Sequence, residues 1–265
     1  CDAIVQIARG FEDADIIHVH GDVNPKRDLE IIETELMLAD LQTLEKRVGK
    51  AESEAKSGKK DAVAYLAILK KTKDALEKGV MLNRVDFTEE EKNALKDLHF
   101  LTMKPQFFVL NVKEDQLTDE QKDKKNVQKI PWEEPTILIC AKIEEELADI
   151  PEQEAQELLA SIGIKESGLN ALVKKAYETL HWITYFTAGP KEVRAWQIPR
   201  GTKAPQAAGV IHTDFEKGFI RAEVIAYQDY IAAGGESGAK EKGLLRLEGK
   251  EYVVQDGDVM HFRFS

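Results

Sequence analysis

The stretch Pro105-Gln106-Phe107-Phe108-Val109-Leu110 runs directly into Asn111-Val112-Lys113-Glu114, and this order decides the predicted fold. A short run of large apolar residues, bounded by a proline and a polar loop, is typical of a buried strand. Loops at the carboxyl ends of parallel strands face bound ligands in open α/β sheets. The stretch therefore predicts a central strand whose following loop belongs to a ligand site.

Similar patterns lie on both sides of this strand. The apolar runs Ala3 to Ala8 and Thr136 to Cys140 predict two more strands, and residues 152–161 and 168–179 predict helices. Strands that alternate with helices favour an α/β domain with a mostly parallel sheet. We assign residues 1–159 to this domain.

Residues 28–98 interrupt the domain with a helical pattern. Asp28 is the predicted N-cap of a long helix, and Thr88 with Glu91 predicts a capping box. Between them, a polar stretch at residues 49–60 separates two helices. This pattern predicts a helical hairpin, or short coiled coil, whose helices pack on each other or dock a partner. The residues expected on the packed faces are Leu29, Ile32, Leu36, Ala39, Leu41, Leu44 and Val48, and then Ala62, Leu66, Leu69, Lys73 and Leu76.

The character of the chain changes after His181. Residues 192–198 alternate, residues 222–230 and 251–254 have strand-like composition, and Asp256-Gly257-Asp258 forms a turn before a last strand at 259–264. These features predict a separate, small α+β domain over residues 181–265.

Composition narrows the class of protein. Hydrophobic residues make up 43% and charged residues 32% of the 265, and 37 Lys+Arg stand against 48 Asp+Glu. The excess of acidic residues lies in residues 1–180 and argues against binding DNA and against non-specific nucleic-acid binding over the whole surface. Residues 181–265 hold 11 basic and 11 acidic side chains, and this neutral balance leaves room for a local patch that faces RNA. No run approaches the roughly 18 apolar residues of a membrane span. We expect a cytoplasmic protein without a membrane partner.

Two loops carry candidate site residues. Asn111 follows a strand, and its amide either bridges two loops or bonds a purine edge, while Glu114 accepts from ring or exocyclic nitrogens. A capping Asn and a solvated Glu are the simpler alternative. Cys140-Ala141-Lys142 follows the next strand, where Cys140 is interpreted as a small buried hydrophobe rather than a nucleophile.

Phosphate-binding signals are not found in these 265 residues. A P-loop requires GxxxxGK[ST], and neither Gly49-Lys50 nor Gly58-Lys59-Lys60 fits that spacing. No DxxG segment occurs, so no Mg²⁺ ligand is identified. We assign no catalytic residue, and none of the six histidines is assigned to a metal or a general base. Since the chain opens with Cys1 inside an apolar run, we expect it to begin within a domain.

The chain resembles the YchF (Obg-like) ATPase family, P-loop NTPases of the TRAFAC class with a C-terminal TGS domain. The resemblance covers essentially all 265 residues, and its segments are FEDADIIHVHGDVNP (11–25), DLEIIETELMLADLQTLEKR (28–47), LTMKPQFFVLNVKED (101–115) and YFTAGPKEVRAWQIPRGTKAPQAAGVIHTDFEKGFIRAEVI (185–225). It implies a partial nucleotide-binding domain lacking the N-terminal P-loop region, with the helical insertion at 28–98, and a β-grasp TGS domain at 181–265.

The resemblance also implies a function. The intact protein is expected to use Mg²⁺, to hydrolyse ATP in preference to GTP and to associate with the ribosome, while this chain by itself should be inactive. Base recognition is carried over to Asn111, Val112 (through its backbone) and Glu114, and more weakly to Phe11 and Cys140-Ala141-Lys142.

The alternative function is a non-catalytic module that binds the ribosome or its RNA through the TGS and helical parts. In the TGS part, aromatic side chains at Trp196 and Phe219 are available for stacking or else fill the core. The cations that either face phosphate or are merely solvated are Arg194, Lys203, Arg221 and Arg246.

Overall fold

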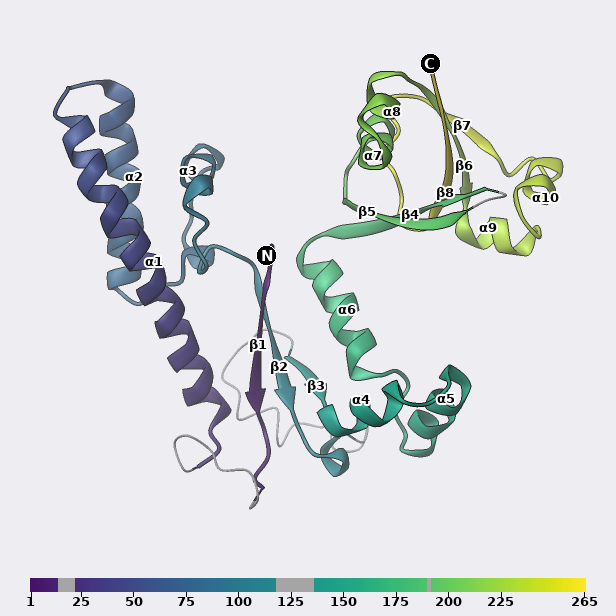
Figure 1. Ribbon diagram of the computed structural model, residues 1–265, viewed down its shortest axis with the longest axis horizontal. Helices are drawn as coiled ribbons and strands as arrows, with labels where there is room; N and C mark the ends of the chain where they lie inside the picture. Colours follow the sequence, from purple (N-terminus) through teal and green to yellow (C-terminus); the bar gives the residue numbers. More distant parts are fainter. Residues whose placement is uncertain (14–21, 118–135, 190–191) are drawn as a thin grey trace. The chain divides into compact units, whose positions relative to one another are not determined.

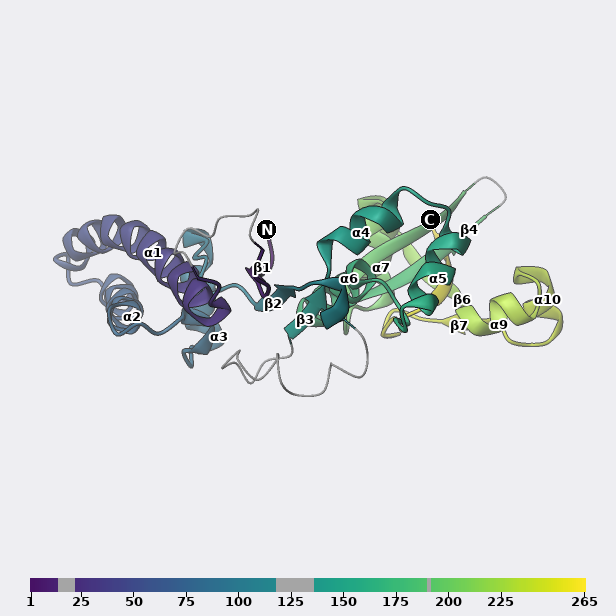
Figure 2. The same cartoon turned by 90° about the horizontal axis from the view of Figure 1, so that it is seen from below.

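The computed structural model describes residues 1–13, 22–117, 136–189 and 192–265. It separates into two compact units, residues 1–176 and 177–265, which are coloured along the chain in Figures 1 and 2. The boundary falls inside helix α6 (Gly168–Thr179), between the ends of the two predicted domains. In the described part of the chain, every helix is too short or too polar to cross a bilayer.

The first unit contains a parallel sheet of three strands, β1 (Ile4–Arg9), β2 (Gln106–Asn111) and β3 (Thr136–Ile139), in that order. Helices α4 (Ala141–Ala148), α5 (Glu152–Ser161) and α6 follow β3. Phe108 and Leu110 of the central strand are buried in a cluster with Leu29 and Ile143. The α/β class and the parallel pairing predicted from residues 105–114 are therefore confirmed.

A helical hairpin separates β1 from β2 in the sequence. Helices α1 (Pro25–Ala55) and α2 (Lys60–Glu77) lie side by side in Figure 1 and share a core that includes Leu44, Leu69 and Leu76. Short helices η1 (Leu82–Arg84), α3 (Glu89–Leu95) and η2 (Lys96–Leu98) then lead to β2. The capping box is confirmed, because Thr88 accepts from the Glu91 N–H while the Glu91 carboxylate accepts from the Thr88 N–H.

The start of α1 and its buried face differ from the sequence prediction. Asn24, not Asp28, is the N-cap, since its side chain accepts from the Arg27 N–H and Pro25 occupies the first turn. Ile32 and Ala39 are exposed, whereas Glu33 and Asp40 are buried. The apolar periodicity failed here because both acids have partners elsewhere in the fold.

Those partners fasten the hairpin to the loop before β2. The Glu33 carboxylate lies 3.0 Å from the Arg84 guanidinium. The Asp40 carboxylate accepts from the Leu101 N–H at 2.8 Å and from the Thr102 N–H and hydroxyl, each at 2.7 Å. Buried carboxylates persist when hydrogen bonds satisfy them in this way. These two acids therefore position α1 relative to the strand that carries the candidate site.

The second unit is a five-stranded mixed sheet in the order β5-β4-β8-β6-β7. Strands β4 (Trp182–Ala188) and β5 (Val193–Pro199) form a hairpin, and β6 (Phe219–Ala226), β7 (Arg246–Glu248) and β8 (Asp258–Phe264) complete the sheet. The helices are α7 (Ala204–Ile211), α8 (Thr213–Lys217), α9 (Tyr227–Ala232) and α10 (Glu236–Glu241). The predicted α+β class of this part is confirmed.

Two of its predicted strands are wrong in extent. Residues 227–230 turn into α9 instead of continuing β6, and residues 251–254 make only an isolated bridge, from Val253 to Lys203. One face of the sheet buries Tyr185, Val224 and Phe262 under Ala207 and Ala208 of α7. The small residues of α7 permit this close approach of the helix to the sheet. The sequence pattern indicated only strands and turns in this part of the chain, so it did not predict α7.

Candidate nucleotide-base site

Three loops leave the same edge of the first unit's sheet. The strands end in register, with Arg9 beside Asn111 and Asn111 beside Ile139. Backbone hydrogen bonds continue past the strands, from the Gly10 N–H to the Asn111 carbonyl and from the Val112 N–H to the Ile139 carbonyl, each at 2.8 Å. Because parallel strands present all their carboxyl ends at one edge, the predicted segments at Phe11, Asn111 and Cys140 come together there.

Asn111 connects two of these loops. Its side-chain oxygen accepts from the Ala141 N–H at 3.1 Å. A backbone N–H needs an acceptor, so this contact orients the amide with its NH₂ group away from Ala141. That NH₂ group has no partner among the residues the structure describes, which makes it a donor for a ring nitrogen or carbonyl of a base. Of the two roles expected for Asn111, the structure shows the bridging one.

A cavity of about 380 Å³ lies between the first two loops. The Phe11 ring contributes to its wall, with the Arg9 guanidinium 4.7 Å and the Lys113 ammonium 5.9 Å from the ring centroid. These contacts hold the ring by cation–π attraction. The residues that line the cavity are Gly10, Phe11, Glu12, Val23, Pro25, Leu110, Val112, Lys113, Asp115 and Gln116.

The acidic residue of the Asn111 loop that lines this cavity is not the one singled out from the sequence. Glu114 is exposed at the start of η3 (Glu114–Gln116) and does not line the cavity, whereas Asp115 does. Sequence reasoning missed Asp115 because the tetrapeptide spacing stops one residue before it.

A glycine is needed at position 10 because the backbone there passes close to the Leu110 side chain. A Cβ atom on this residue would lie 2.7 Å from Cγ of Leu110. Contacts under about 3 Å do not occur between carbon atoms without movement of the chain. A glycine therefore lets the loop that carries Phe11 cross the end of β2.

The third loop contributes differently from the other two. Cys140 is buried at 4% exposure in the apolar cluster of the sheet, consistent with its interpretation as a small hydrophobe. Ala141 supplies the N–H bonded to Asn111, and Lys142 is an exposed residue in the first turn of α4.

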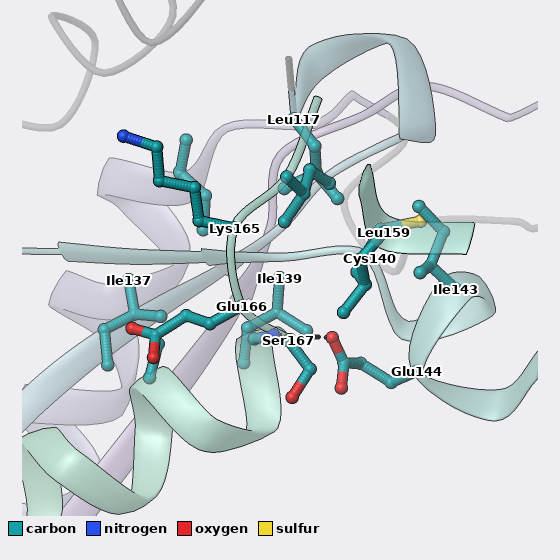
Figure 3. A pocket seen from close by; sticks show the side chains of 14 residues that line it. Leu117, Ile137, Ile139, Cys140, Ile143, Glu144, Leu159, Lys165, Glu166 and Ser167 are labelled. Carbon is teal, nitrogen blue, oxygen red and sulfur yellow. Dashed lines mark hydrogen bonds between the residues drawn. The ribbon is translucent and has the colours of Figure 1, made fainter. Parts of the chain in front are cut away.

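A larger cavity, of about 740 Å³, lies between β3 and helices α4 to α6. Figure 3 shows aliphatic side chains such as Leu117, Ile139 and Leu159 around it. The carboxylate of Glu144 is already bonded, since it accepts from the Gly168 N–H at 2.6 Å and caps α6. Glu144, Lys165, Glu166 and Ser167 also line this cavity, but Phe11 and the loop after β2 line the smaller one, so we place the base site there.

The four basic residues expected from the sequence to face phosphate do not lie on one face of the second unit's sheet. Arg194 lies opposite Thr187 and Arg246 opposite Val224, so both project on the helix-covered face but from the two edge strands. Arg221 pairs in register with Arg263 on the other face. Lys203 precedes α7 and is ion-paired with Glu251. The fold therefore separates residues that the sequence grouped.

The aromatic neighbours of these cations belong to the domain itself. Phe219 is 4% exposed and belongs to the core, so of the two roles expected for it, stacking or filling the core, the structure shows the second. Trp196 packs against the core, its indole N–H donates to the Thr187 hydroxyl, and the Arg194 guanidinium lies 4.1 Å from its ring centroid. Arg246 contacts the Tyr252 hydroxyl and the buried Asp258 carboxylate at 3.2 and 3.4 Å.

Comparison with known proteins is consistent with these two units. A family profile named YchF-GTPase_C and described as "Protein of unknown function (DUF933)" matches residues 182–265. The chain is 51% identical over 269 aligned residues to a ribosome-binding ATPase YchF of Bacillus subtilis (strain 168), covering 100% of this chain and 73% of that protein. The chain belongs to the YchF family.

Further relatives agree with that assignment. A ribosome-binding ATPase YchF of Escherichia coli O157:H7 is 48% identical, covering 100% of this chain and 73% of that protein. The solved YchF GTPase of Schizosaccharomyces pombe aligns with a TM-score of 0.82 and 36% identity, over 99% of this chain and 72% of that one. A GTP-binding protein of Pyrococcus horikoshii OT3 matches with a TM-score of 0.59 and 19% identity, over 100% of this chain and 79% of that one, a likeness of fold alone.

The described residues at the sheet edge do not supply a cluster of magnesium ligands. Across the described ranges, three metal-ligating side chains come close together at Glu223, Glu236 and His261, which belong to the second unit. Both oxygens of Glu223 are already bonded to Arg263. We therefore derive no reaction step through a metal.

Proposed function

We propose that this chain belongs to a cytoplasmic, ribosome-associated NTPase and supplies the loops that recognise the base of ATP in preference to GTP. The observation that carries the proposal is the convergence of Phe11, Asn111 and Ala141 at one edge of a parallel sheet. The names of the relatives, ribosome-binding ATPase and GTPase, support the nucleotide and the ribosome as partners.

The chemistry of the edge suits adenine. The Phe11 ring offers an apolar wall, the Asn111 amide offers a donor, and Val112 lines the cavity. Guanine presents N1–H and 2-amino donors, which a carboxylate at the usual position of an NKxD motif would accept. Here the fourth residue is the longer Glu114, so we propose that the carboxylate is displaced and that adenine, which lacks those donors, is preferred.

Hydrolysis is proposed for a form of the protein that carries a P-loop. Phosphoryl transfer depends on backbone N–H groups, a lysine and Mg²⁺ ligands that cradle the phosphates. These 265 residues contain no GxxxxGK[ST] motif, and we propose that they do not hydrolyse ATP by themselves. The base loops and the phosphate site would then make separable contributions to affinity.

The decisive experiment compares two carboxylates one residue apart. We would measure the binding of fluorescent ATP and GTP analogues to the P-loop-bearing form and to its Glu114→Asp and Asp115→Glu variants. Glu114→Asp should shift the ratio of the two dissociation constants toward GTP by about tenfold, or ~1.4 kcal/mol. Asp115→Glu tests the carboxylate that lines the cavity, and Glu145→Asp, an exposed acid of α4 that lines neither cavity, is the matched control that should leave the ratio within about twofold.

The alternative outcomes are distinct. An unchanged ratio in Glu114→Asp, with a shift in Asp115→Glu, would assign base recognition to the carboxylate that lines the cavity. If neither variant changes the ratio, the preference for ATP does not arise in this loop and the base-recognition proposal fails.

A further inference from the structure

The helical hairpin has an uneven distribution of charge. Residues 25–45, nearer the sheet, carry two Lys and Arg side chains against six Asp and Glu, whereas residues 46–78 carry ten against five. The whole chain has a formal net charge of −11. The far half of the hairpin is therefore a basic region on an acidic protein, and a local excess of one sign attracts the opposite charge.

The lysines concentrate where α1 turns into α2. Lys50 lies in the last turns of α1, Lys56 is its C-cap, Lys59 is the N-cap of α2 and Lys60 is its first residue. We call these four residues the lysine tip. All four are exposed, and none forms an ion pair with a residue that the structure describes. In Figure 1 the turn lies at the end of α1 away from β1.

Neighbouring acidic side chains offset only part of this positive charge. Glu54 is bonded by Arg47, which also contacts Tyr65, so that acid is already neutralised within the hairpin. Two other acids, Glu52 and Asp61, are exposed at this end. Over residues 46–61 six basic side chains still outnumber three acidic ones.

The tip also departs from what helix stability favours. Lys59 makes no side-chain capping bond, and Lys59 and Lys60 place two positive charges at the positive end of α2, where Asp61 is the one acidic residue of the first turn. The same unit caps α3 with Thr88 and three acidic residues. A local rule that is broken and only partly compensated within the fold is typical of a functional position.

We propose that the lysine tip binds the phosphate backbone of a folded RNA. Lysine ammonium groups suit phosphates as point charges. Residues 46–64 contain no aromatic side chain for stacking on bases, so the contact reads backbone and not sequence. Residues 56–61, Lys-Ser-Gly-Lys-Lys-Asp, also contain no apolar side chain to insert into a lipid surface. Naming ribosomal RNA as the source of the phosphates rests on the proposed function.

The test replaces charge at the tip and, separately, elsewhere in the same unit. The tip variant is Lys56→Gln/Lys59→Gln/Lys60→Gln, and the matched control is Lys70→Gln/Lys78→Gln/Lys96→Gln, three exposed lysines without an ion pair to a described residue. Lys78 lies about 27 Å from Lys60 along the helix axis. Circular dichroism would establish that both variants keep the helical content of the full chain.

Binding to a fluorescent duplex RNA hairpin is measured over a range of salt concentrations. The tip variant should bind on the order of tenfold or more weakly at low salt, and the slope of log affinity against log salt should fall by about 3, one for each phosphate that the variant no longer neutralises. The control should retain the slope of the parent chain. Equal losses of affinity in both variants would show an effect of net charge and overturn the proposal, as would unchanged binding in the tip variant.

Two further measurements separate the possible sources of the phosphates. Binding of the parent chain to phosphatidylserine vesicles but not to RNA would assign the tip to a membrane surface and overturn the proposal. Cosedimentation with ribosomes tests the proposed function apart from the tip. If the parent and the tip variant cosediment equally and bind RNA equally, the tip proposal fails and the ribosome association stands. If the parent binds RNA through the tip but does not cosediment, the tip proposal stands and the proposed ribosome association fails.

Discussion

Replacing Asp40 by alanine is expected to destabilise the first unit by about 3 kcal/mol. The Asp40 side chain is 3% exposed, and its carboxylate accepts three hydrogen bonds of 2.7 to 2.8 Å from Leu101 and Thr102. A buried donor left without an acceptor costs about 1–3 kcal/mol. Thr102 is fully buried and loses the acceptor of its N–H and of its hydroxyl, whereas Leu101 is half-buried and its N–H regains water. The two unsatisfied groups of Thr102 together cost about 2–6 kcal/mol, and the expected value of about 3 kcal/mol lies in the lower half of that range.

The assay is urea unfolding followed by far-UV circular dichroism, together with amide hydrogen exchange at residues 101 and 102. With a slope of about 1–3 kcal/mol per molar urea, the midpoint of the first unit should fall by about 1 M or more. The control is Glu35→Ala, an exposed acid on the same helix without an ion pair to a described residue, which should change stability by less than about 0.5 kcal/mol. Equal midpoints for the two variants, or retained exchange protection at Thr102 in Asp40→Ala, would refute the reasoning.

Three other changes have clear expected outcomes. Gly10→Ala should destabilise the first unit by about 1–3 kcal/mol, because its Cβ would overlap Leu110, while Gly49→Ala, in open space inside α1, should stabilise it by about 0.5–1 kcal/mol; urea midpoints measure both. Asn111→Ala should abolish exchange protection of the Ala141 amide, which Asn111→Asp should preserve by keeping the acceptor. The Arg263 hydrogen bonds lower the pKa of Glu223, so this carboxylate stabilises the second unit above its ordinary pKa and loses that effect as the pH falls through the lowered value. Glu223→Gln should therefore melt slightly earlier than the parent at neutral pH and show a smaller drop at about pH 3, by thermal melts followed through tryptophan fluorescence; equal drops would contradict this.

The candidate site illustrates how far local pattern extends. An apolar run followed by a polar loop predicted each strand end, and parallel pairing made it necessary that the loops at Phe11, Asn111 and Cys140 meet. The pattern did not predict which acid of the Asn111 loop lines the cavity. In the single turn of η3, Asp115 lines the cavity and Glu114 does not. The spacing of a motif does not determine which of two adjacent residues in a short helical turn faces the cavity.

The cations of the second unit show a different limit. Arg194, Lys203, Arg221 and Arg246 are similar in sequence terms, but strand alternation and strand order place them on two faces and at opposite edges of the sheet. Composition reports how much charge a domain carries, whereas topology decides where it lies. The proposed RNA contacts of these four residues remain a prediction.

Sequence by itself determined the α/β class, the parallel strands, the hairpin of two long helices and the small mixed second unit, since these depend on local periods of apolar residues and on capping and turn residues. Only the tertiary structure decided which face of α1 is buried. There Glu33 and Asp40 point inward and Ile32 and Ala39 outward, because donors from Arg84 and from residues 101–102, far along the chain, satisfy the two acids. The apolar periodicity of a helix contains no information about partners so distant in sequence. The pattern of α1 therefore could not predict that these two charged side chains are buried.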